Sequence, residues 1–135
     1  MSAEIPQLLA QAREKAAIDV PAPQIEAEVI DLMAVFEARM QHHFKRGPFY
    51  KKLRALLNEA GNPVLADSVH HYAQAINVLK HGTGASYREL KSAQSLPFTL
   101  KIPAGNIRLV DVTQDEFYLG VVDTLTQAYA VLNAR

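Results

Sequence analysis

The sequence predicts an all-α protein, an antiparallel bundle of five to six helices with a small β-hairpin inserted before the last helix. Three observations lead to this fold class. Apolar residues recur at spacings of three and four along most of the chain, and glycine and proline fall where these runs stop. Between residues 97 and 112 the pattern changes to alternation. No repeat or low-complexity linker divides the chain, so we expect one domain over residues 1–135.

The first half of the chain contains three amphipathic runs. The first covers residues 4–17 and ends at the stretch DVPAP, because proline fixes φ and disfavours helix in the residue before it. The second has apolar positions over residues 25–44, about six turns of helix. Gly47 and Pro48 separate it from a third run that starts at Phe49.

The fourth run has clear helix signals at both ends. Asn62 is a good N-cap, Pro63 suits the first helical position, and Gly82 suits the position after the helix. Ser86 and Glu89 then form the S-x-x-E pattern of a capping box, which predicts a short helix to about residue 94.

The period changes in the next segment. In PFTLKI, Phe98, Leu100 and Ile102 alternate with polar residues, and IRLVDV follows a turn cluster, so residues 97–112 are predicted to form a hairpin. A second capping-box pattern, Thr113 and Glu116, then predicts the start of the final helix.

The amino-acid composition excludes several classes of protein and of active site. With 49% hydrophobic and 21% charged residues, the chain has the composition of an ordinary globular protein. It contains no cysteine, which excludes disulfides, thiolate metal ligands and cysteine nucleophiles. No segment resembles a signal peptide or approaches the roughly 20 apolar residues of a membrane span. We therefore expect a cytoplasmic protein that does not bind membranes.

The charges are unevenly distributed, although the formal net charge is zero. Residues 39–54 carry six basic side chains and no acidic one, whereas residues 1–37 carry seven acids and two bases. A local basic segment is a candidate phosphate-binding surface. Its alternative interpretation is a solvated corner that pairs with the acidic ends of the chain. The ligand-binding candidates from this segment are Lys45, Arg46, Lys51 and Lys52.

The fourth helix carries a polar stripe beside its apolar one. His70, Gln74, Asn77 and His81 follow spacings of four, three and four, which places them about 100° from the predicted buried face. Two imidazoles and two amides suit hydrogen bonding to a ligand at near-neutral charge. The alternative is that His81 compensates the helix dipole while the amides are solvent-exposed.

The segment INVLKHGTGASYREL, residues 76–90, resembles the signature region of the HEPN superfamily (higher eukaryotes and prokaryotes nucleotide-binding). Those domains are helical bundles that commonly dimerise. Their motif has an arginine, a polar residue that is often asparagine, and a histidine four residues later. Asn77 and His81 match the second and third elements, and Ile76 occupies the arginine position. The resemblance implies a homodimer that binds RNA or a nucleotide.

In active HEPN proteins the motif supports metal-independent RNA cleavage. The histidine exchanges a proton with the reacting hydroxyl groups, and the arginine stabilises charge on the phosphoryl oxygens. Because the Ile76 side chain carries no positive charge, the resemblance implies a binding domain with weak or no catalysis. If activity remains, Asn77 and His81 are the catalytic candidates. Two alternatives stay open: a toxin-like endoribonuclease with an antitoxin-type protein partner, and a helical dimerisation module without a ligand.

The five histidines raise the question of a metal site. His42/His43 and His70/His71 are adjacent pairs, so one member of each pair could join His81 in a three-histidine site. No motif of fixed metal-ligand spacing supports that arrangement. We therefore expect neither a metal nor a cofactor.

Overall fold

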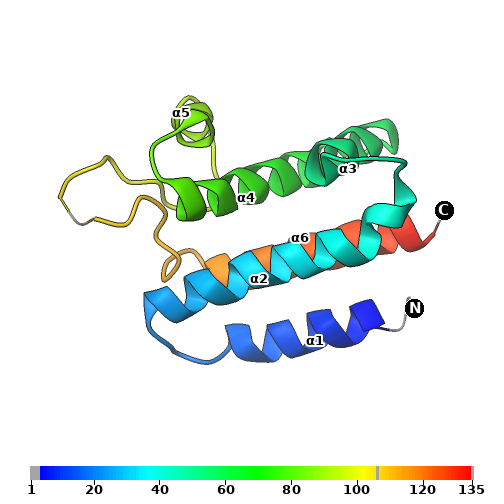
Figure 1. The fold of residues 1–135 in the computed structure, drawn as a ribbon, viewed down its shortest axis with the longest axis horizontal. Helices are drawn as coiled ribbons and strands as arrows, with labels where there is room; N and C mark the ends of the chain where they lie inside the picture. Colours follow the sequence, from blue (N-terminus) through cyan, green and yellow to red (C-terminus); the bar gives the residue numbers. More distant parts are fainter. Residues whose placement is uncertain (1–3, 106, 135) are drawn as a thin grey trace.

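The computed structural model describes residues 4–105 and 107–134. Within these residues it confirms the all-α class (Figure 1). The helices are α1 (Glu4–Ala16), α2 (Ala22–Met40), the 3₁₀ turn η1 (Gln41–His43), α3 (Phe49–Glu59), α4 (Pro63–His81), α5 (Ala85–Lys91) and α6 (Phe117–Asn133). None of the helices in this described part is long and apolar enough to cross a membrane.

The long helices lie roughly parallel to one axis (Figure 1). In this arrangement α1 contacts α2 and α6, α3 contacts α4, and α4 also contacts α2, α5 and α6. Consecutive helices α1 and α2 run in opposite directions, as do the neighbours α4 and α6, which agrees with antiparallel packing. The neighbours α2 and α6 instead run in the same direction, so the bundle is not a simple up-and-down one.

The apolar stripes meet in one core. The fourth helix buries Leu65, Val69, Tyr72 and Ile76, which follow one another at spacings of four, three and four and therefore share one helix face. The Tyr72 ring packs against Phe117 of α6 at a centroid distance of 5.5 Å. Burial of each large side chain contributes about 1.5–3 kcal/mol, so this seam fixes α4 and thereby the position of its polar face.

The predicted hairpin at residues 97–112 is wrong. The described residues of this segment form a loop in which Leu100 and Val110 make one isolated antiparallel bridge, flanked by backbone hydrogen bonds of 2.7 and 3.2 Å. Pro103 has no N–H to extend the ladder beyond Lys101. Ile102 is 74% exposed, so the alternating pattern does not turn all three apolar residues inward.

Several predicted helix ends also change. The second helix ends at Met40 and continues as a 3₁₀ turn, so the run to Phe44 is not α-helical. The Asn62 cap is confirmed, because its side chain accepts a hydrogen bond from Leu65 N. Both predicted capping boxes are wrong: α5 begins before Ser86, and α6 begins only after Glu116, without a side-chain cap in either case.

Candidate functional site

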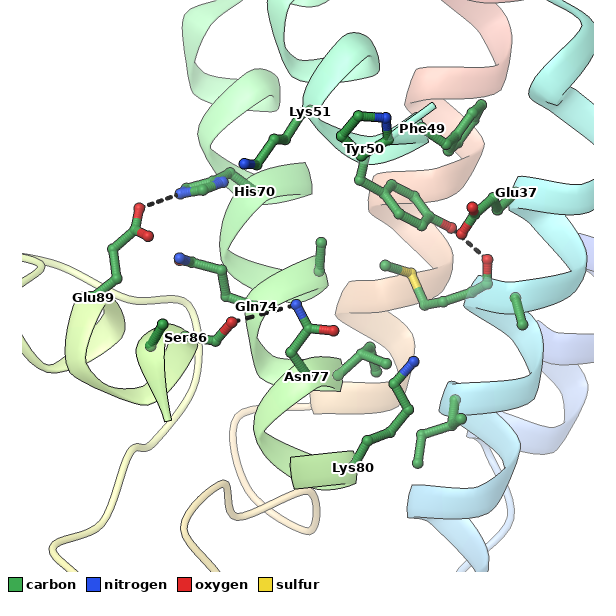
Figure 2. A pocket seen from close by; sticks show the side chains of 17 residues that line it. Glu37, Phe49, Tyr50, Lys51, His70, Gln74, Asn77, Lys80, Ser86 and Glu89 are labelled. Carbon is green, nitrogen blue, oxygen red and sulfur yellow. Dashed lines mark hydrogen bonds and ion pairs between the residues drawn. The ribbon is translucent and has the colours of Figure 1, made fainter. Parts of the chain in front are cut away.

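A cleft of about 450 Å³ lies between α2, α3, α4 and α5 (Figure 2). Three buried side chains, Met33, Phe49 and Ile76, contribute to its apolar floor. The polar residues that line it are Glu37, Tyr50, Lys51, His70, Gln74, Asn77, Lys80, Ser86 and Glu89. Most ligand pockets combine an apolar lining with a few polar groups in this way.

The polar stripe of α4 forms one wall of this cleft. His70, Gln74 and Asn77 line it, as their shared helix face requires. The next lining residue is Lys80, three positions after Asn77, whereas the exposed His81 is not part of the lining. The stripe therefore continues at a spacing of three rather than four. Sequence reasoning missed Lys80, although the i, i+3 spacing was the signal that could have found it.

Two side-chain contacts connect α4 to the short helix α5. His70 Nε2 lies 2.8 Å from Glu89 Oε1 and donates to that carboxylate. Asn77 Nδ2 donates to Ser86 Oγ over 3.3 Å. The hydrogen bond from His70 lowers the pKa of Glu89, and the Gln74 amide adds a smaller effect in the same direction. Glu89 is therefore held as an anion beside the cleft.

The opposite wall is closed by a contact between α2 and α3. The Tyr50 hydroxyl donates to the Met33 carbonyl over 2.5 Å (Figure 2). Burial raises the pKa of Tyr50 well above its ordinary value, and the nearby Glu37 carboxylate raises it further. The phenol is therefore neutral, and its proton is already used by a backbone acceptor.

Three charged groups of the lining have no ion pair within the described residues: Lys51, Lys80 and Glu37. Each side chain is exposed enough to reach a ligand. Figure 2 shows Lys80 extending from α4 into the cleft. Unpaired cations above an apolar floor suit an anionic ligand that also has an apolar or aromatic part.

The basic segment is divided between the cleft and the outside. Lys51 lines the cleft, whereas its exposed neighbour Lys52 does not. Lys45 and Arg46 lie in the exposed turn between η1 and α3 and are not part of the lining. The structure thus brings Lys51, His70, Gln74 and Asn77 together, and leaves Lys45, Arg46, Lys52 and His81 outside this cleft.

Two features bear on the sequence hypotheses about chemistry. Ile76, at the arginine position of the HEPN motif, is only 5% exposed and belongs to the apolar floor. The three-histidine arrangement does not form: no group of three or more histidine, aspartate and glutamate side chains in residues 4–105 and 107–134 could hold a metal ion. The histidine in the cleft lining is His70 rather than His81, and its Nε2 contacts Glu89.

Comparison of the chain with protein families, curated protein sequences and solved structures finds no match. The likeness to the HEPN superfamily therefore depends on Asn77 and His81 in the sequence. Of these two residues, only Asn77 lines the cleft.

Proposed function

We propose that this protein is a HEPN-like nucleotide-binding domain whose ligand occupies the cleft between α2, α3, α4 and α5. The observation that carries the proposal is the combination of an apolar floor with Lys51 and Lys80, which have no ion pair within the described residues. The cleft volume of about 450 Å³ lies within the usual range of small-molecule sites, about 300–1,000 Å³.

The lining offers a place for each part of a nucleotide. A base is flat and apolar on its faces, and it would contact Met33 and the aromatic ring of Tyr50. A phosphate would accept charge-assisted hydrogen bonds from a lysine side chain of the lining. Asn77 uses one amide N–H on Ser86, which leaves its second N–H and its carbonyl oxygen to the ligand.

Our proposal includes binding without catalysis. His81 is not part of the lining, and the side chain at the arginine position is the buried Ile76. No cation therefore replaces the motif arginine at that position, and such a contact contributes about 3 kcal/mol in comparable electrostatic sites. A toxin-like ribonuclease is the less favoured alternative for the same reasons.

RNA binding outside the cleft is a second candidate function. Lys45, Arg46 and Lys52 are exposed and make no ion pair within the described residues. Cations of this kind bind a nucleic-acid backbone with an affinity that falls steeply with salt. A mononucleotide in the cleft would show a much weaker salt dependence, because few phosphate contacts form.

The homodimer remains a prediction, but the polar stripe of α4 is less suited to be its contact surface than the sequence indicated. The stripe residue Gln74 is only 7% exposed, and His70 and Asn77 already contact α5. A second chain could therefore contact Asn77 and His81, which are exposed, but not the buried Gln74. Sedimentation at high micromolar concentration tests the dimer, and a monomer would remove that prediction.

Calorimetric titration with AMP tests the proposed function. The double variant Lys51→Ala/Lys80→Ala should weaken binding by at least about tenfold, since it removes both cations of the lining and with them the charge-assisted contact to the phosphate. The matched control is Lys45→Ala/Lys52→Ala, which removes the same two charges outside the cleft. Absence of AMP binding at millimolar concentration, or equal loss in both double variants, would contradict the proposal.

A further inference from the structure

The charges of the cleft differ between its two ends. Lys80 lies ten residues after His70 on the same helix, which corresponds to a rise of about 15 Å. Figure 2 shows Glu37, Tyr50, Lys51 and the His70–Glu89 pair toward one end and Lys80 toward the other. We name these the His70 end and the Lys80 end.

The His70 end has an excess of carboxylate. Lys51 contributes one positive charge there, while Glu37 and Glu89 contribute two negative charges. The His70 Nε2–H donates to Glu89, so this N–H is not available to a ligand. At the Lys80 end, no carboxylate belongs to the lining, and Asn77 adds an amide. The anionic part of a ligand is therefore attracted to Lys80 and repelled from the carboxylates.

Glu37 determines what the other part of the ligand must offer. Its carboxylate can only accept hydrogen bonds, and it has no ion pair within the described residues. Its neighbour Tyr50 cannot satisfy it, because that hydroxyl donates to the Met33 carbonyl. A ligand group facing Glu37 therefore has to be a hydrogen-bond donor.

We infer that the cleft selects nucleotides whose base carries an exocyclic amine, with the amine at Glu37 and the phosphate at Lys80. This inference rests on the proposed function. Adenine, cytosine and guanine each present an exocyclic amine donor. Uracil and thymine have a carbonyl acceptor at the position where cytosine has its amine, and their remaining edge donor, the ring N3–H, lies between two carbonyl oxygens that a carboxylate repels. A carbonyl placed against the Glu37 carboxylate would bring two acceptors together, which disfavours pyrimidines of that type.

Paired titrations test this selection. Wild-type protein should bind AMP at least about fivefold more tightly than UMP, the lower bound for a good base contact. Glu37→Gln should reduce that ratio toward one, because the glutamine amide can donate to a carbonyl as well as accept from an amine. Glu59→Gln, which removes an exposed carboxylate on α3 outside the cleft lining, is the matched control and should keep the ratio.

The orientation is tested with adenosine, which lacks the phosphate. Lys80→Ala should weaken AMP by about tenfold and leave adenosine nearly unchanged, and Lys51→Ala should have the smaller effect on AMP. Equal binding of AMP and UMP, or an unchanged ratio in Glu37→Gln, would overturn the selection while leaving the proposed function intact. Failure of every nucleotide to bind would overturn the proposed function itself.

Discussion

The Glu89 carboxylate on α5 lies 2.8 Å from the His70 imidazole on α4, and this pair joins the two helices that form one side of the cleft. Helix α5 has only seven residues, too few to be stable in isolation. It is held by the buried side chains Tyr87 and Leu90 together with this pair. That wall of the cleft therefore depends on tertiary contacts rather than on helix propensity.

The first prediction concerns the pH dependence of this contact. The hydrogen bond from His70 lowers the folded-state pKa of Glu89 below its ordinary value of 4.5. The carboxylate therefore stabilises the fold fully above that ordinary value, and the stabilisation is lost as pH falls through the lowered pKa. Because Glu89 is exposed, we expect Glu89→Gln to lose at most about 1 kcal/mol near pH 6, and this loss should shrink as pH falls below 4.5 and through the lowered pKa.

Urea unfolding of both proteins across that pH range measures the difference. Glu59→Gln serves as the control, since Glu59 is also exposed and makes no ion pair within the described residues. A difference between Glu89→Gln and wild type that stays constant down to the lowest pH would contradict the assignment.

The second prediction concerns Gly120 on α6. A β-carbon at this position would lie 2.1 Å from the Tyr72 hydroxyl oxygen and 2.9 Å from its ring carbon Cζ. In an open helix position, Gly→Ala stabilises by about 1 kcal/mol. Here we expect Gly120→Ala to destabilise by about 1–3 kcal/mol because Tyr72 must move.

Thermal unfolding of a double-mutant cycle tests whether the clash with Tyr72 causes the loss of stability in Gly120→Ala. Tyr72→Phe removes the atom of closest approach, so the cost of Gly120→Ala should shrink in that background. An unchanged cost would show that another contact is responsible, and a raised melting temperature for Gly120→Ala alone would exclude the clash.

The third prediction concerns Ile76, which takes the place of the motif arginine in the proposed resemblance to HEPN proteins. Because this side chain is buried in the cleft floor, Ile76→Arg places an unpaired charge in the core. We expect a loss of at least about 3 kcal/mol in the free energy of unfolding and no gain of ribonuclease activity. Ile76→Val, with an expected cost of about 0.5–1.5 kcal/mol, is the conservative control.

A ribonuclease assay without added metal completes this test. If Ile76→Arg were folded and cleaved RNA in a manner abolished by His81→Ala, the binding-only account would be wrong. The same assay on the wild-type protein should show no cleavage that depends on His81.

Local sequence patterns were sufficient to predict most of the helices. The three/four spacing identified the buried face of α4, and Asn62 with Pro63 marked its start, because capping chemistry is decided by neighbouring residues. The hairpin prediction failed because alternation alone does not supply the missing N–H of Pro103 or cover the exposed Ile102.

The residues of the cleft could be predicted only in part from local sequence patterns. The stripe on α4 predicted that His70, Gln74 and Asn77 share one helix face, and these three residues line the cleft. Their ligand-binding role stays a prediction. The predicted stripe ended at His81, whereas the cleft lining ends at Lys80. The difference arises because α2, α3 and α5 determine the direction in which the cleft opens. Glu37 and Tyr50 enter the site from separate helices, and no local pattern in the sequence marks either residue.

Nuclear magnetic resonance of ¹⁵N-labelled protein titrated with AMP tests the central claim most directly, because it reports where the ligand binds. Our account predicts that the largest shift changes arise in the cleft lining, at Tyr50, Ala73, the Asn77 side-chain amide and Lys80, while Lys45 and Lys52 change little. Shift changes centred on residues 45–46 and 52, or on His81, with the cleft residues unchanged, would contradict it.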